Sequence, residues 1–370
     1  MQIQAAVVEE EGGAFEIQTL ELDEEPRSDE VLVRVVSAGV CHTDLSTAEN
    51  FYGTPFPMVL GHEGAGVVEA VGDDVTDVEV GDHVAMSYDF CGECRNCLSG
   101  RIPYCENLYE HNFLGGRTED GSSPLSRDGE RINGVYFSQS SWATHSIANE
   151  RNVVKVDPEI PLEIVGPLGC GIQTGAGAVM NALEPEAGSS VAVFGVGSVG
   201  ISSVMAAAHV TGCTDVIAVD LNDDRLAKAA ELGATHTINP EEEEPVDAIH
   251  EITGGGADYS LETTAVPEVL RQAVECTRIP GECGLIGAAP AGTEVSLDMH
   301  TFHFGHKLRG IIEGDAVPEL FIPTLLDLWQ QGRFPFDEIV TKYEFGELHE
   351  AIEDAEEGTT IKPVLQMDSP

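Results

Sequence analysis

The chain has 370 residues, of which 42% are hydrophobic, so it is long enough for two globular domains with buried cores and too apolar for a disordered chain. Its 65 acidic residues against 18 basic ones give a formal net charge of −47, which argues by charge repulsion against nucleic acid and membrane surfaces as partners. The sequence contains no apolar run long enough to span a membrane and no export signal, so we expect a cytoplasmic protein.

The acidic residues are scattered along the whole chain rather than gathered in a tail, as in the runs 9–11, 24–25 and 241–244. Self-repulsion of this kind weakens a compact state at moderate salt, whereas at about 1 M salt the Debye length shrinks to about 3 Å. We therefore predict a halophilic protein. An acidic protein of ordinary salt conditions is the alternative.

Short valine-rich strands separated by glycine turns characterise residues 1 to about 165. The clearest are Gln2–Val8, Val31–Val40 and Gly64–Val71, which predict a mostly β domain. The stretch Gly115–Asn133 is rich in Gly, Ser, Asp and Arg, and we expect it to be a surface excursion.

Four of the nine cysteines, Cys91, Cys94, Cys97 and Cys105, lie within this domain at spacings C-x2-C-x2-C-x7-C. Four thiolates in so tight a loop can surround one tetrahedral zinc ion, and a closed site of four thiolates leaves no vacant position for a substrate. An iron–sulfur cluster and unligated thiols are the alternatives, although cluster motifs usually continue C-x3-C-P. The loop therefore predicts a structural zinc site.

The pattern changes from about residue 166 onward to alternating strands and helices, which predicts a parallel sheet covered by helices on both faces. The predicted elements are a helix at Val199–Val210, a strand at Val216–Asp220, a helix at Asp223–Leu232, a strand at Ala257–Glu262, a helix at Pro267–Thr277, a strand at Glu282–Ala288, a helix at Val317–Gln331 and a final helix–strand pair ending at Gln366.

A dinucleotide site is predicted where the strand at 190–194 meets the motif Gly195-Val196-Gly197-Ser-Val199-Gly200. The motif follows a strand and opens a helix, so the glycines permit a tight turn, close approach of a pyrophosphate and close helix–strand packing. Asp220 ends the next strand, twenty residues after Gly200, where its carboxylate can bind ribose hydroxyls and repel a 2′-phosphate. This favours NAD over NADP.

A second metal site is a weaker hypothesis from the residues alone. Cys41, His62 and Cys170 each lie in a glycine-rich neighbourhood, and together they would supply two thiolates and one imidazole with one position open, as a catalytic zinc site needs. The three lie far apart in the sequence, so spacing alone leaves buried cysteines and a surface histidine as alternatives.

Taken together, these motifs resemble the zinc-containing medium-chain alcohol dehydrogenase family nearly from end to end. They are the segments Gly39-Val-Cys41-His42-Thr43-Asp44, Gly61-His62-Glu63-Gly64, the cysteine loop 91–105, Gly169-Cys170-Gly171 with Thr174-Gly175, and Gly195–Gly200. The phrases Gly171-Ile-Gln-Thr-Gly-Ala-Gly-Ala and Gln139-Ser-Ser-Trp-Ala-Thr are similar to the benzyl (aryl) alcohol dehydrogenase branch.

The resemblance implies an α/β fold: a GroES-like, mostly β catalytic domain at 1–166, a Rossmann domain at 167–305, a return to the catalytic domain at 306–370, and a cleft between the two domains. It also implies one catalytic and one structural zinc per chain, with NAD as cofactor, and a homodimer or homotetramer as the assembly.

The resemblance further assigns site residues. It implies that Cys41, His62 and Cys170 are the catalytic zinc ligands, that Asp44 orients His62, that Glu63 lies near the metal, and that Thr43 takes the proton of the substrate. By the same resemblance His42 contacts the cofactor pyrophosphate, Thr174 the nicotinamide, Arg225 the adenosine side and Lys362 the phosphates. Ser46 stands where many animal members carry the last histidine of a proton relay, so the final proton acceptor stays open.

The expected function is reversible oxidation of primary alcohols, aromatic or medium-chain, to aldehydes by hydride transfer to NAD. Ser87, Tyr88, Phe51 and Phe113 are candidates for contacting such a substrate. Three alternatives remain: a polyol or sugar dehydrogenase, which often has a carboxylate in place of Cys170; a glutathione-dependent formaldehyde dehydrogenase, which would need cationic groups; and a nucleotide-binding scaffold without catalysis.

Overall fold

The structure, a computed structural model, describes residues 1–367, and its internal contacts divide the chain into two compact units. Unit 1 comprises residues 1–170, 317–323 and the part from 339 onward, and unit 2 comprises 171–316 and 324–338. The predicted boundary at 305/306 falls earlier than the one at 316/317, because strand β16 (Lys307–Gly310) pairs with β15 (Thr277–Leu285) in the sheet of unit 2.

Unit 1 is built on two sheets of antiparallel strands, apart from one parallel pair, β17 with β18. One sheet has the order β4-β1-β2-β7-β8, and the other has the order β10-β6-β5-β3-β18-β17, with β9 also paired to β3. The strands are β1 (Gln2–Val8), β2 (Phe15–Leu22), β3 (Glu30–Gly39), β4 (Met58–Val59), β5 (Gly64–Val71), β6 (His83–Met86), β7 (Leu125–Arg127), β8 (Glu130–Ile132), β9 (His145–Asn149), β10 (Val153–Val156), β17 (Val340–Glu344) and β18 (Lys362–Gln366). The predicted β character of this part of the chain is confirmed.

The polar stretch Gly115–Asn133 is more than the surface excursion that its composition predicted. It forms the hairpin β7–β8, and β7 extends the first sheet by pairing with β2. The sparse apolar residues of the hairpin, Leu125 and Ile132, are 4% and 1% exposed, because they point into the core next to that sheet. Two buried side chains in so polar a stretch are too few to produce a visible alternation.

Unit 2 contains a six-stranded parallel sheet with the strand order β13-β12-β11-β14-β15-β16, in which the chain starts at the middle and winds outward in both directions. Its remaining strands are β11 (Ser190–Phe194), β12 (Asp215–Val219), β13 (His236–Ile238) and β14 (Ala257–Glu262). All five residues of β11 are buried, as expected for a strand covered on both faces. This strand order confirms the predicted Rossmann arrangement.

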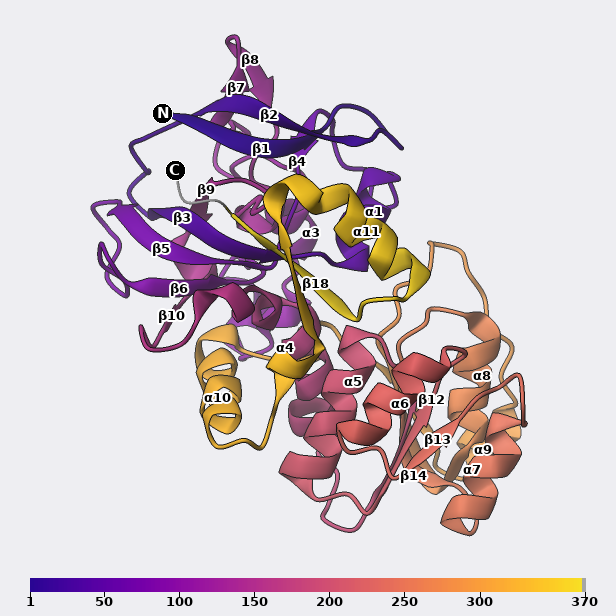
Figure 1. Ribbon diagram of the computed structural model, residues 1–370. Helices are drawn as coiled ribbons and strands as arrows, with labels where there is room; N and C mark the ends of the chain where they lie inside the picture. The colour runs from indigo at the N-terminus through magenta and orange to yellow at the C-terminus, as the bar shows by residue number, and fades with distance from the viewer. Residues whose placement is uncertain (368–370) are drawn as a thin grey trace. The chain divides into compact units, whose positions relative to one another are not determined.

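The helices of unit 2 cover both faces of this sheet, with α5 and α6 on one side and α7, α8 and α9 on the other (Figure 1). They are α4 (Gly171–Gly177), α5 (Ser198–Met205), α6 (Asp223–Glu231), α7 (Pro245–Thr253), α8 (Pro267–Glu275) and α9 (Met299–His303). Helix α6 begins as predicted, because the Asn222 side chain accepts hydrogen bonds from the N–H groups of Asp224 and Arg225 at 2.9 and 3.1 Å.

The helices of unit 1 are short, apart from one near the end of the chain that packs along β18 (Figure 1). They are α1 (His42–Ala48), α2 (Arg95–Leu98), α3 (Leu108–Asn112) and α11 (Leu348–Glu357), and α10 (Pro318–Gln330) runs from unit 1 into unit 2. Over residues 1–367, none of the helices combines the length and apolar character needed to cross a membrane.

Candidate active site

Unit 1 brings together the three residues that the motifs singled out as ligands of a catalytic metal. Cys41 immediately precedes α1, His62 lies two residues before the start of β5, and Cys170 ends the first segment of the unit. Ligand atoms of these three residues and of Glu63 all lie within 4.8 Å of one another. His62 is fully buried, so the cluster lies inside the protein rather than on its surface.

Asp44 fixes the orientation of His62. Its buried Oδ1 lies 2.8 Å from His62 Nδ1 and also accepts a hydrogen bond from the Gly61 N–H at 3.0 Å. The carboxylate therefore keeps the proton on Nδ1 and leaves Nε2 free to bind a metal. The resemblance assigned this orienting role to Asp44, and the two contacts are those that such a role needs.

Two groups of the cluster, His62 and Cys41, have pKa values shifted toward their charged forms. Burial opposes protonation of His62, but the charges of Asp44 and Cys41 outweigh it and raise the pKa of His62 well above its ordinary value. A hydrogen bond with the Cys170 thiol and the charge of His62 together outweigh burial and lower the pKa of Cys41 well below its usual range. A metal ion that binds here therefore meets a thiolate and displaces a proton from His62.

Glu63 is committed to a buried cation. Its two carboxylate oxygens lie 2.8 and 2.5 Å from Lys362 Nζ, and Glu63 and Lys362 are 0% and 1% exposed. Lys362 also donates a hydrogen bond to the carbonyl oxygen of Val40 at 3.1 Å. The resemblance directed Lys362 at cofactor phosphates. In the structure its ammonium is paired with Glu63, and this pairing offsets the cost of burying both charges in unit 1.

The segment that carries Cys170 reaches the cluster through glycines. A Cβ atom on Gly166 would lie 2.3 Å from the Glu63 carbonyl oxygen, and one on Gly169 would lie 2.1 Å from the Met86 carbonyl oxygen. Any larger residue at either position would push this segment away from the backbone of Glu63, which follows His62, or from the end of β6. These glycines explain how the sequence places Cys170 beside ligands more than a hundred residues earlier.

The cluster fits a zinc ion. With Glu63 held by Lys362, two thiolates and one imidazole remain, and three protein ligands of this kind leave one position open, as catalytic zinc sites do. His62 Nε2 is buried and has no hydrogen-bond partner among the described residues, an unfavourable state for a buried polar atom unless a ligand binds there.

The predicted proton-handling residues lie at the start of α1. Thr43 and Ser46 are half-buried and His42 is exposed. His42, which directly follows the Cys41 ligand, is therefore the side chain that could pass a proton to solvent.

Of the predicted substrate contacts, Phe51 is 36% exposed, whereas Tyr88 and Ser87 are fully buried.

The cysteine loop forms a second cluster. Its four sulfur atoms all lie within 4.8 Å of one another, with 3.4 Å between Cys94 and Cys97 and 3.4 Å between Cys91 and Cys105. These separations are far longer than a disulfide bond of about 2.05 Å and close to the edge, about 3.8 Å, of a tetrahedron with Zn–S bonds of about 2.3 Å. Backbone N–H groups of Cys97 and Glu106 hydrogen-bond the Cys94 sulfur and lower its pKa to about 6.

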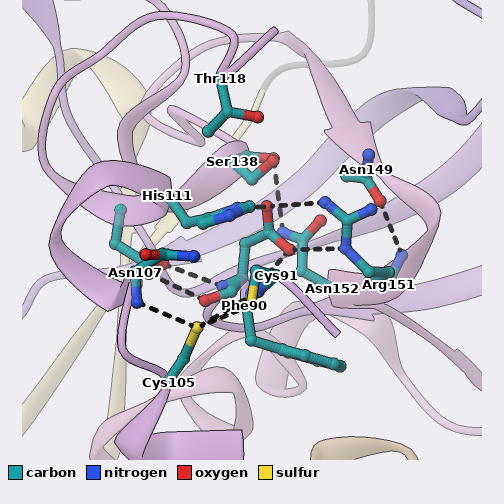
Figure 2. Close-up of polar contacts among 12 residues, drawn as sticks. Phe90, Cys91, Cys105, Asn107, His111, Thr118, Ser138, Asn149, Arg151 and Asn152 are labelled. Atoms are coloured by element: carbon teal, nitrogen blue, oxygen red, sulfur yellow. Dashed lines mark hydrogen bonds and ion pairs between the residues drawn. The ribbon is translucent and has the colours of Figure 1, made fainter. Parts of the chain in front are cut away.

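Side chains that flank the cysteine loop fix both of its ends (Figure 2). The buried Asp89 carboxylate, just before the loop, accepts hydrogen bonds from His111 Nδ1 at 2.9 Å and from Arg151 Nε at 3.2 Å. The Asn112 amide bonds both the N–H and the carbonyl oxygen of Asp89, each at 2.9 Å. The segments before and after the four cysteines are thereby joined, as a structural metal site requires.

Unit 2 contains the predicted dinucleotide turn between β11 and α5. A Cβ atom on Gly197 would meet nothing within 4 Å, so the backbone there is open to a phosphate, whereas one on Gly200 would lie 1.9 Å from the Gly195 carbonyl oxygen. Asp220 accepts hydrogen bonds from the N–H groups of Val196 at 2.7 Å and Asn222 at 2.9 Å, which ties the acidic residue to the turn.

The other predicted cofactor residues in unit 2 have distinct surroundings. Val199 is half-buried in α5 and Arg225 is half-buried in α6. The Thr174 hydroxyl lies 3.3 Å from the carboxylate of Glu313, which also accepts a hydrogen bond from Gln173 at 3.2 Å. Sequence reasoning missed Glu313, because nothing in its local pattern marks a residue whose partners lie about 140 positions away.

Comparison with known proteins identifies the family of this chain. Residues 27–158 match the family described as alcohol dehydrogenase GroES-like domain, and residues 198–330 match the family described as zinc-binding dehydrogenase. A geraniol dehydrogenase of Castellaniella defragrans is 44% identical over 364 residues, which cover 98% of this chain and 97% of the relative. The chain belongs to the zinc-binding alcohol dehydrogenase family.

Solved structures of this family agree over the whole length. An alcohol dehydrogenase zinc-binding domain protein from Burkholderia ambifaria has a TM-score of 0.97 at 49% identity, and a benzyl alcohol dehydrogenase from Acinetobacter calcoaceticus has a TM-score of 0.96 at 44% identity, each covering 100% of both chains. The predicted family, the GroES-like and Rossmann fold and the prediction of a zinc-dependent alcohol dehydrogenase are therefore confirmed.

Proposed function

We propose that this alcohol dehydrogenase oxidises primary alcohols that carry an aromatic or medium-chain apolar group to aldehydes, with NAD as hydride acceptor, and also catalyses the reverse reaction. The observation that carries the proposal is the cluster of Cys41, His62 and Cys170, in which His62 Nε2 is buried without a partner among the described residues. The names of two relatives, a geraniol and a benzyl alcohol dehydrogenase, support an apolar substrate.

Aromatic rings in unit 1 support the same substrate class. The Phe137 ring lies 4.5 Å from the His62 ring, centroid to centroid, and Phe113 lies 5.1 Å from Phe137. Tyr52 stacks on Phe113 at 4.3 Å, and Phe51 packs against Tyr52 at 4.6 Å. This aromatic chain runs from a partly exposed residue to a metal ligand and offers apolar contacts next to the place where an alcohol would react.

The residues of unit 1 would then have defined roles. Zinc held by the three ligands supplies a Lewis acid that lowers the pKa of an alcohol, and NAD held by unit 2 supplies the hydride acceptor. Thr43 accepts the hydroxyl proton of the substrate, and the exposed His42 next to it, or water, takes that proton onward. Asp44 keeps the His62 tautomer that binds the metal.

The choice of NAD over NADP is supported by Asp220. Its carboxylate follows β12 and is fixed by two backbone N–H groups, so a negative charge stands where the ribose 2′ position of a dinucleotide lies in Rossmann folds. We further infer two zinc ions per chain, one for each cluster of ligand atoms.

Adaptation to high salt is part of the proposal. The formal charge of −47 comes from surfaces such as Glu241–Glu244, all four of which are exposed. Carboxylates at this density repel each other until salt screens them. Unfolding measured between about 0.1 and about 3 M KCl tests this, because a halophilic chain gains stability over that range and an ordinary acidic chain does not.

A homodimer or homotetramer is the expected assembly. Strand β16 is an end strand of the six-stranded sheet, and Met299 and Phe304 nearby in sequence are 85% and 47% exposed. An end strand and exposed apolar side chains close to it in the sequence support association with a second copy. Sedimentation equilibrium in high salt distinguishes monomer, dimer and tetramer.

The experiment that tests the proposed reaction compares NAD reduction with benzyl alcohol, hexanol, ethanol and glucose at about 2 M KCl, with zinc counted in the same sample. Turnover of benzyl alcohol or hexanol with two zinc ions per chain is the expected result. Activity confined to ethanol would refute the substrate class, and one zinc ion without activity on any alcohol would refute the metal site.

A further inference from the structure

Gln139 is a fully buried amide that begins one of the phrases resembling the aryl alcohol dehydrogenase branch, and the resemblance assigned it no role in the site. Its Oε1 accepts a hydrogen bond from the Gly64 N–H at 3.0 Å, and its Nε2 donates to the carbonyl oxygens of His62 at 2.9 Å and Ser87 at 3.0 Å. Two of these bonds hold the backbone on either side of Glu63, the residue that directly follows the metal ligand His62.

The third bond, to the Ser87 carbonyl oxygen, links Gln139 to the segment that carries another ligand, Cys170. The Ser87 hydroxyl donates to the carbonyl oxygen of Gly169 at 2.6 Å, and Gly169 directly precedes Cys170. Because a Cβ on Gly169 would lie 2.1 Å from the Met86 carbonyl oxygen, these two segments are in close backbone contact. One side chain, Gln139, thus connects the segments that carry His62 and Cys170.

The turn that presents Gln139 is held in an uncommon backbone conformation. Phe137, Ser138 and Ser140 have φ values of 49°, 52° and 48°, in the left-handed region that residues other than glycine seldom adopt. Such conformations persist only where the surroundings determine them. Here the Ser140 hydroxyl accepts the Tyr136 N–H at 3.0 Å and the Ser146 hydroxyl donates to the carbonyl oxygen of Gln139.

We propose that Gln139 is a positioning residue of the catalytic metal site. Its amide sets the separation between the His62 imidazole and the Cys170 sulfur by fixing the backbone that carries each of them. It touches neither substrate nor cofactor in this role. The inference rests on the proposed metal set of Cys41, His62 and Cys170.

The chain offers a matched control. Asn112, also fully buried in unit 1, makes the same pattern of bonds: its Oδ1 accepts the Asp89 N–H, and its Nδ2 donates to the carbonyl oxygens of Asp89 and Leu108. Gln139→Met and Asn112→Leu therefore each remove three hydrogen bonds from a buried backbone. In Gln139→Met the Gly64 N–H and the His62 carbonyl oxygen lose their amide partner, whereas the Ser87 carbonyl oxygen keeps the Asn152 amide at 3.1 Å. Only Gln139→Met affects a segment with a proposed catalytic ligand.

The experiment uses cobalt(II) as the probe in full-length protein in high salt. Visible absorption bands that disappear in Cys170→Ser report the catalytic site, and release of that cobalt to a chelator gives its off-rate. Because supporting residues around a metal typically change affinity by about 10- to 100-fold, we expect Gln139→Met to shift these bands and to speed release by about tenfold or more. Asn112→Leu should leave the Cys170-dependent bands and their off-rate within about twofold of the unmodified chain. Because Asn112 supports the cysteine loop, any change that it causes there is read separately, from the bands that persist in Cys170→Ser.

The outcomes separate the two hypotheses. An unmodified chain whose bands do not depend on Cys170 refutes the proposed metal set, and with it the inference. Cys170-dependent bands that are unchanged in Gln139→Met, or changed equally in Asn112→Leu, refute only the role of Gln139. If Gln139→Met does not fold, Gln139→Asn serves, since it keeps an amide but is too short for all three bonds; unchanged bands and off-rate there refute the role equally.

Discussion

Replacing Lys362 by methionine should destabilise unit 1 strongly, because Glu63 would be left as an unpaired buried charge. The Lys362 ammonium lies 2.5 and 2.8 Å from the two Glu63 oxygens, and neither residue is more than 1% exposed. At an effective dielectric constant of about 20, such charges attract by about 6 kcal/mol, most of which offsets the cost of their burial. Loss of one partner therefore costs about 3–5 kcal/mol, or about 10 °C in unfolding temperature.

The assay is urea or thermal unfolding of metal-free protein in high salt, so that loss of zinc does not contribute. Lys155→Met is the matched control, because Lys155 is 52% exposed and pairs with Asp82 at 2.7 Å in the same unit. An exposed pair of this kind contributes at most about 1 kcal/mol. The double variant Glu63→Gln with Lys362→Met should recover much of the lost stability. A loss for Lys362→Met no larger than for Lys155→Met would refute the reasoning.

Three further predictions follow from other parts of the chain. Asp220→Ala should shift the ratio of kcat/KM for NAD and NADP toward NADP by about tenfold, since the repulsive carboxylate is removed; an unchanged ratio contradicts the proposed role. Cys97→Ser should lower the zinc content from two ions to one and reduce the unfolding temperature, whereas two retained zinc ions would contradict the structural cluster. Burial and the hydrogen bond to Asp354 raise the pKa of Tyr343 to about 12, so its contribution to stability is complete below pH about 10 and is lost as the pH rises toward 12; Tyr343→Phe should flatten this alkaline loss in unfolding titrations.

Local patterns in the sequence predicted several elements to the residue. The strands expected at Gln2–Val8, Gly64–Val71 and Ala257–Glu262 coincide with β1, β5 and β14, because glycine turns and apolar runs are local signals. The strand expected at Glu282–Ala288 instead occupies Thr277–Leu285, and the preceding helix ends at Glu275. Here the register is set by pairing with β14 and β16, which the local sequence does not contain.

The same distinction applies to the site. The metal ligands lie in short motifs that a family resemblance can identify. The residues that support them are marked only by contacts over long sequence separations: Gln139 with His62 across 77 positions, and Lys362 with Glu63 across 299. No periodicity or spacing reports such pairs, so neither the local sequence nor the resemblance indicated the pairing of Lys362 with Glu63 or a role for Gln139.

The position of β18 has a consequence for the order in which the protein is made. The sheet of unit 2 is complete once residue 310 has been synthesised, whereas the second sheet of unit 1 waits for β18, which lies between β3 and β17. β18 also delivers Lys362 to Glu63, so the first 170 residues carry all the proposed metal ligands before they acquire the cation that neutralises their buried carboxylate. Because chains emerge from the ribosome N-terminus first, unit 1, which carries the proposed metal ligands, is the first unit to begin synthesis and the last to be completed.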